Sequence, residues 1–106
     1  MADHWYVGYF KLFRDKGYHQ SATLRNALSS AYRESKKNRR TVMIFREWIA
    51  KSGDKEIKVL QKKVAEVWYY EGYFQDIRGK VLVRMTDKDW RILKSDGTIN
   101  KEKVRL

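Results

Sequence analysis

The sequence predicts a single α+β domain in which amphipathic helices pack on a small antiparallel sheet or on a C-terminal β-hairpin. Two observations predict this class. Apolar residues recur at helical spacing in two segments, and β-prone runs bounded by glycine lie in the second half of the chain. With 106 residues the chain is the size of one domain, 1–106, that buries one modest core.

The chain is strongly basic. Lysine and arginine total 24 against 13 aspartate and glutamate residues, so the formal net charge is +11. Part of the excess is concentrated in the run Arg33–Arg40. Such a charge raises self-repulsion in a compact protein, whereas a phosphate backbone turns it into binding free energy through the release of counterions. We therefore expect a polyanionic partner, and nucleic acid first.

Composition excludes several other classes of protein. There is no cysteine, which rules out disulfides, thiolate metal sites and a cysteine nucleophile. No apolar run approaches the roughly 18 residues of a membrane span, and the first residues lack a basic segment followed by an apolar one. We expect a protein of the cytoplasm or of an organellar matrix that is not secreted and does not bind a membrane.

Two segments of the first half fit either a strand or a helix. Residues 3–17 hold an aromatic-rich, β-prone run in which Gly8 weakens a helix, although Gly17 is well placed to end one. Residues 41–51 begin with a short β-prone run, yet their apolar residues also fit helical spacing. Both alternatives stay open for both segments.

A helix is predicted from Ser21 to Ser35 or Lys37. Its apolar residues recur at steps of three and four and form one stripe, made of Leu24, Ala27, Leu28, Ala31 and Tyr32. The opposite face is polar and carries Arg25, Ser29, Arg33 and Lys36. The basic run therefore begins on a helix and continues into the connection that follows.

A second helix is predicted from Asp54 to Glu71, with Asp54 as its cap and Gly72 after its end. At 100° per residue one side of this helix is mainly apolar and holds Ile57, Leu60, Val64, Val67, Trp68 and Glu71. The other side holds Lys55, Lys58, Lys62 and Tyr69. We expect the first set to meet the core and the second to meet solvent or a ligand.

The sequence of the last third of the chain predicts mainly β-strands. Residues 73–77 and 80–85 fit the two arms of a β-hairpin whose turn is Arg78-Gly79. Thr86 then fits the start of a short helix that holds Trp90, by a capping-box-like spacing to Asp89. In the alternative, residues 90–94 are a strand paired with the chain end across a turn at 95–98.

Binding of nucleic acid needs cations for the phosphates, and planar or hydrogen-bonding groups for the bases. We expect Tyr69 to stack on bases because it shares the lysine stripe of the second predicted helix. The full set of candidate residues is Lys36, Lys37, Arg39, Arg40, Lys55, Lys58, Lys62, Tyr69, Arg78, Lys80 and Arg84.

Nothing in the sequence predicts catalysis, a metal or a cofactor. His4 and His19 are the only histidines, and they are not at a metal-ligand spacing. Two glutamate-x-lysine patterns, 34–36 and 56–58, match a spacing found in metal-dependent nucleases, but both lie where we expect helices and that arrangement needs a strand. We therefore expect a binding protein that is not an enzyme.

The segment 64–77, Val-Ala-Glu-Val-Trp-Tyr-Tyr-Glu-Gly-Tyr-Phe-Gln-Asp-Ile, resembles the small-subunit ribosomal protein eight family, in which a helix ends in glutamate-glycine-aromatic before a strand. Residues 28–33 and 41–44 are similar to that family's first helix and strand. The resemblance covers residues 22–85 and implies an α-β-α-β-β half and a structural role on ribosomal RNA. The loops of that family's C-terminal half are missing, so no RNA contact is carried over to a residue.

The junction at 64–77 is also similar to a winged-helix module, in which a helix enters a DNA groove and a basic hairpin touches the backbone. We expect non-catalytic binding of nucleic acid, with RNA slightly favoured over DNA and neighbouring proteins as further partners in a ribonucleoprotein particle. The alternatives are a winged-helix DNA-binding regulator and a small basic inhibitor or adaptor that docks on an acidic protein surface.

Overall fold

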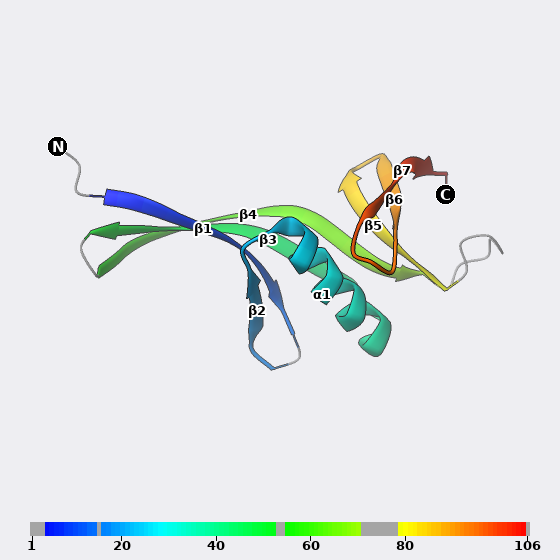
Figure 1. Cartoon of the computed structure of the whole chain (residues 1–106), viewed down its shortest axis with the longest axis horizontal. Coiled ribbons are helices and arrows are strands. Elements are labelled where there is room, and N and C mark those ends of the chain that lie inside the picture. Colours follow the sequence, from blue (N-terminus) through cyan, green and yellow to red (C-terminus); the bar gives the residue numbers. More distant parts are fainter. Residues whose placement is uncertain (1–3, 15, 53–54, 71–78, 106) are drawn as a thin grey trace.

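The computed structural model of the chain has one α-helix packed on a seven-stranded antiparallel sheet (Figure 1). The structure describes residues 4–14, 16–52, 55–70 and 79–105. In chain order the elements are β1 (His4–Phe13), β2 (Tyr18–Ser21), α1 (Leu24–Asn38), β3 (Val42–Ser52), β4 (Lys55–Tyr70), β5 (Lys80–Thr86), β6 (Asp89–Leu93) and β7 (Ile99–Val104). The predicted α+β class is confirmed.

The strands lie in the order β2-β1-β3-β4-β5-β6-β7. The chain leaves the sheet after β2, forms α1 across one face, and returns so that β3 lies beside β1 (Figure 1). The two segments left open by the sequence, 3–17 and 41–51, contain the antiparallel strands β1 and β3, in register from His4 opposite Ser52 to Leu12 opposite Ile44. Pairing between distant segments thus decides what local periodicity could not.

The predicted first helix is confirmed, with a start three residues after Ser21. Thr23 is the N-cap, and its hydroxyl accepts a hydrogen bond from the backbone N–H of Asn26. The apolar stripe faces the sheet, where Ala27, Leu28 and Ala31 are at most 3% exposed. The main core joins these residues to the sheet residues Leu12, Val42, Ile44, Ala65, Val67, Val81, Val83 and Leu93.

The predicted second helix is wrong, because Lys55–Tyr70 is the long strand β4. Its last part alternates as a strand should: Ala65 and Val67 are buried against α1, while Glu66 faces the opposite side. Register shifts lie opposite the Ile44/Phe45 and Ala50/Lys51 steps of β3, and each bulge interrupts the alternation. These interruptions produce the apolar spacings of three and four residues that resemble a helix. Up to residue 70 the helix implied by both family resemblances is therefore absent.

The C-terminal part is a meander of β5, β6 and β7. The second arm of the predicted hairpin is confirmed as β5, but it pairs with β4 and β6. Its first arm, 73–77, lies outside the described residues. The short helix after Thr86 is wrong, and the alternative is confirmed: β6 pairs across the 95–98 turn with the chain end, β7.

The sheet face opposite α1 carries a second apolar cluster. Trp68 of β4 and Trp90 of β6 have ring centroids 4.2 Å apart, and Leu82 of β5 between these strands is fully buried. The C-terminal strands therefore pack apolar residues on both faces, with Val81, Val83 and Leu93 in the main core on one side and this cluster on the other. No helix in the described residues is long and apolar enough to cross a membrane.

Candidate nucleic-acid interface

The C-terminal end of α1 and the residues just after it hold four of the predicted residues, namely Lys36, Lys37, Arg39 and Arg40. Arg39 adopts the left-handed conformation, with φ 49° and ψ 49°, and its backbone N–H donates to the carbonyl of Ser35. Lys36 and Lys37 lie in the last turn, where the negative end of the helix dipole stabilises positive charge. Helix termination alone accounts for lysines at this place, so further evidence is needed for a binding role.

A groove of about 500 Å³ runs beside this helix end, between α1 and the strands β5 and β6. Three lysines are among the residues that line it: Lys36 of α1, Lys80 of β5 and Lys94 just after β6. The Lys36 ammonium donates a hydrogen bond of 2.9 Å to the hydroxyl of Tyr32, and this bond raises the pKa of Lys36. The structure thus brings together two residues predicted from the sequence, Lys36 and Lys80, and adds Lys94.

A second cavity of about 360 Å³ lies on the other side of the same helix end. It is lined by Lys37 and Glu34 of α1 and by Arg14 and Lys16 from the β1–β2 connection. Glu34 forms its ion pair with Arg40 and not with Lys37: its carboxylate accepts a hydrogen bond of 3.2 Å from the Arg40 guanidinium. The two cavities together place cations from three separate parts of the chain around one helix end.

The lysine stripe predicted on a second helix does not exist as such. Lys62 is exposed on β4, opposite Arg46 of β3. Tyr69 is half-buried and packs against the main core. The core covers part of its ring, which makes it a poorer candidate for base stacking than we expected. The backbone of Lys55 and Lys58 belongs to β4, and their side chains lie outside the described part of the structure, as does all of Arg78.

Arg84 lies on the opposite face of the sheet from α1, where it contacts Glu66 and Trp90 of the same protein. Its guanidinium is 2.8 Å from the carboxylate of Glu66 and 5.5 Å from the ring centroid of Trp90. Lys63 also binds Glu66, at 2.5 Å. Burial by itself raises the pKa of Glu66, but the hydrogen bonds and charges of Lys63 and Arg84 lower it below its usual range. Arg84 is therefore a structural partner of a buried carboxylate.

Glu47 of β3 is the second buried carboxylate on this face, and it is 4% exposed. Its oxygens accept hydrogen bonds from the hydroxyl of Tyr9 and the amide of Gln61, and Lys11 lies 3.6 Å away. Burial alone raises the pKa of Glu47, whereas these three partners bring it below its usual range. These two carboxylates are thus engaged in internal contacts with Tyr9, Gln61, Lys11, Lys63 and Arg84, and are not available to the cations around the end of α1.

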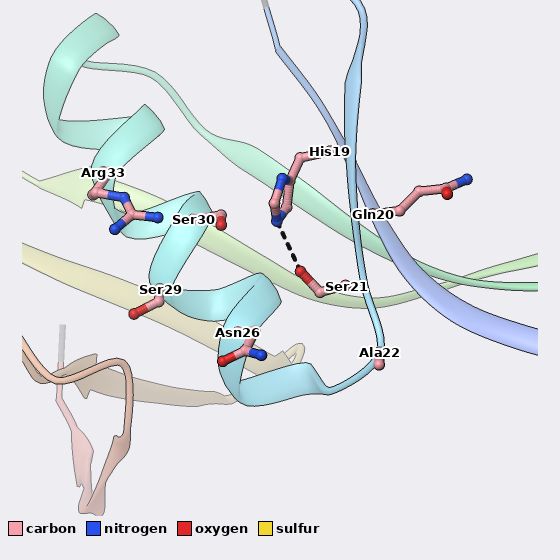
Figure 2. A pocket seen from close by; sticks show the side chains of 8 residues that line it. All are labelled: His19, Gln20, Ser21, Ala22, Asn26, Ser29, Ser30 and Arg33. Carbon is pink, nitrogen blue, oxygen red and sulfur yellow. Dashed lines mark hydrogen bonds between the residues drawn. The ribbon is translucent and has the colours of Figure 1, made fainter.

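A polar groove of about 480 Å³ lies between β2 and the first half of α1 (Figure 2). His19 and Ser21 of β2 reach toward α1, which carries Asn26, Ser30 and Arg33 on its side of the groove.

Hydrogen bonding fixes the tautomer of His19. A guanidinium only donates, so Nδ1 of His19 accepts from Arg14 at 3.2 Å, and its Nε2–H donates to Oγ of Ser21 at 2.8 Å. Burial, followed by the charges of Arg14 and Arg33, lowers the pKa of His19. In this tautomer His19 does not act as a base toward Ser21, so the pair lacks the geometry of a nucleophile and its base.

Among the described residues no group of three or more histidine, aspartate or glutamate side chains is placed to hold a metal ion. Asp89 instead pairs with Arg91 at 2.6 Å, and Asp96 accepts hydrogen bonds from Thr98 in the turn before β7. Comparison of the chain with protein-family models, with curated proteins and with solved structures finds no match.

The sequence prediction missed Arg14, Lys16 and Lys94. Each is a lone cation beside a turn, a pattern that is common on any protein surface. Only the packing of α1 between the β1–β2 hairpin and the β5–β6 pair brings them to the basic run at 33–40 (Figure 1). A weak signal was present in the spacing of Arg14 and Lys16 around a turn that ends at Gly17.

Proposed function

We propose that the protein binds nucleic acid without catalysis and that the C-terminal end of α1 is the centre of the interface. The observation that carries the proposal is the convergence of cations from three segments on this helix end. They come from the β1–β2 connection, from the last turn of α1 and from the β5–β6 region, and they are Arg14, Lys16, Lys36, Lys37, Lys80 and Lys94.

Three of these cations have no ion-pair partner among the described residues, although Glu34 and Asp96 also line the two cavities. Within the described residues no carboxylate lies within ion-pair distance of Lys16, Lys37 or Lys80. A stable fold has no need to gather unpaired cations, because like charges repel one another. A polyphosphate backbone would relieve that repulsion and release counterions, which makes nucleic acid the partner that this surface fits best.

RNA is favoured over DNA as the natural partner. Phe13 and Tyr18 are exposed in the β1–β2 hairpin, next to Arg14 and Lys16 of its turn. RNA offers unpaired bases for such rings in its loops and ends more often than DNA does. Since β4 replaces the helix expected before Gly72, no recognition helix of winged-helix type supports a DNA partner there.

Binding of three fluorescent probes tests this proposal: an RNA hairpin, a DNA duplex and a single-stranded RNA, titrated at about 50 to 200 mM salt. We expect the logarithm of affinity to fall linearly with the logarithm of salt concentration. Six phosphate contacts correspond to a slope of about −5 on duplex DNA and about −4 on a single strand. Absence of binding to all three probes at low salt would overturn the proposal and leave an acidic protein as the partner to test.

A further inference from the structure

Two aromatic side chains are unusually exposed at the end of the β1–β2 hairpin. Phe13 is 47% exposed and Tyr18 is 54% exposed, and the two residues are directly opposite each other in the strand register. Leu12 is fully buried beneath α1, so its neighbour Phe13 points to the other face of the sheet, and Tyr18 shares that face. The hairpin thus presents a pair of rings on the side away from the helix.

Neighbouring residues hold these rings in place. Phe13 and Phe45 of β3 form a T-shaped pair, with ring centroids 6.0 Å apart and planes at 71°. The ammonium of Lys11 lies 4.2 Å from the centroid of Tyr18 and 5.3 Å from that of Phe13. Lys11 is itself held by Glu47 at 3.6 Å. Each ring therefore has packing partners while about half of each residue remains open to solvent.

The ring pair adjoins the basic helix end. The Arg40 guanidinium donates a hydrogen bond of 3.3 Å to the backbone carbonyl of Phe13. Arg14 follows Phe13 directly, and its backbone N–H donates to the carbonyl of Gly17, which closes the turn next to Tyr18. Cations at this turn line the cavity shared with Lys37 of α1. Aromatic rings and positively charged side chains thus lie together at the tip of the β1–β2 hairpin.

We propose that Phe13 and Tyr18 stack on unpaired bases of a single-stranded nucleic acid whose phosphates lie against Arg14, Lys16 and Lys37. The inference rests on the proposed function and specifies the class of ligand. Every base has a face that stacks on an aromatic ring, and cations beside the ring bind the adjoining backbone. In a duplex the base faces are covered by neighbouring base pairs, so the rings contribute to single-strand binding and not to duplex binding.

A variant with both rings replaced, Phe13→Leu with Tyr18→Leu, tests the inference. Leucine keeps an apolar side chain at two exposed positions but removes the ring faces. Met85→Ala is the control, because Met85 is 37% exposed on β5, three strands away from β1 in the sheet, and carries no ring. The probes are an oligouridylate of about 12 nucleotides and an RNA duplex with the same number of phosphates. Thermal unfolding followed by circular dichroism verifies that each variant is folded.

We expect the double variant to lose roughly tenfold or more of its affinity for the oligouridylate, with duplex binding unchanged within about twofold. The control should bind both probes as the wild type does. Equal loss on both probes, or no loss on either, would overturn the role of the rings while leaving nucleic-acid binding in place. Failure of the wild type to bind either probe would overturn the proposed function as well.

Photo-crosslinking of the wild type supplies a measurement that is independent of variant folding. Oligouridylate that carries 5-iodouridine is irradiated with the protein, and the adduct is mapped by mass spectrometry. Adducts on Phe13 or Tyr18 support the inference. Adducts confined to other aromatic residues would contradict it, whatever the affinity of the protein for the probe.

Discussion

The guanidinium of Arg40 donates a hydrogen bond to the backbone carbonyl of Phe13 and so joins the end of α1 to the end of β1, 27 residues earlier in the chain. Arg40 also binds the carboxylate of Glu34, six residues earlier on α1. This contact sets the β1–β2 hairpin beside the basic helix end. It explains how an aromatic pair and a cluster of lysines, far apart in sequence, come to lie on neighbouring surfaces around the hairpin.

Gly97 lies in the turn between β6 and β7, close to α1. Its φ is +85°, and a Cβ atom added there would lie 2.5 Å from Oγ of Ser29 and 3.3 Å from the carbonyl of Arg25. We expect Gly97→Ala to lower the free energy of unfolding by about 2 kcal/mol or more, since backbone strain adds to a steric overlap. Urea unfolding at neutral pH measures the change.

Gly17→Ala is the control for Gly97→Ala, because Gly17 has a φ of +78° with no atom within 4 Å of an added Cβ. Only backbone strain applies there, at about 1 kcal/mol. The combination of Gly97→Ala with Ser29→Ala should recover part of the loss by removing the closest atom. Equal destabilisation at the two glycines would show that the turn does not dock on α1 as described.

Glu66 and Glu47 give the fold a dependence on pH. Both carboxyl groups have a pKa below the usual value, so the native state releases these protons more readily than the unfolded chain does. Their contribution to stability is complete above the unfolded pKa of about 4.3 and is lost as pH falls through the lower folded values. We expect Glu66→Gln to lower the free energy of unfolding at pH 7 by about 1–3 kcal/mol.

The same variant should flatten the decline of stability below about pH 5, because one of the responsible groups is gone. Glu102→Gln is the matched control, since Glu102 is exposed on the edge strand β7. Chemical unfolding at a series of pH values measures both proteins. A decline as steep in Glu66→Gln as in the wild type would remove Glu66 from the account of acid sensitivity.

His19 should remain neutral to a lower pH than an exposed histidine does. Burial opposes its protonation first, and the charges of Arg14 and Arg33 add to that effect, so its pKa is lowered. Nitrogen-detected NMR should find the proton on Nε2, and Arg14→Gln should raise the pKa of His19. Protonation of Nδ1 in the neutral form, or a pKa unmoved by Arg14→Gln, would contradict the hydrogen bonds that link these side chains.

Local patterns predicted α1 well and β4 badly, and the difference has a physical basis. The helix has a regular apolar stripe and a capping residue within one turn of the expected start. In β4 two bulges break the alternation, so apolar residues fall at steps of three and four as in a helix. The β-branched and aromatic residues near its end, such as Val67 and Trp68, were the better guide to a strand.

The candidate site also has residues that the sequence could locate and residues that it could not. The run from Lys36 to Arg40 is contiguous and could be located from the sequence. Arg84 was indistinguishable from the other cations, since the carboxylate that engages it, Glu66, is 18 residues earlier. Lys16 lies beside Lys37 only because tertiary packing brings the β1–β2 turn to the end of α1, and no local sequence pattern predicts that packing.

We propose that the arrangement of cations around the end of α1, and not the total charge of the protein, binds nucleic acid. The most direct test compares Lys16→Glu with Lys37→Glu against Lys101→Glu with Lys103→Glu on β7, two double variants that change net charge equally. The measurement is the slope of log affinity against log salt for a single-stranded RNA. We expect the first variant to bind more weakly, with a slope shallower by about 1.4, and the second to bind nearly as the wild type does. Equal effects of the two variants would contradict the claim.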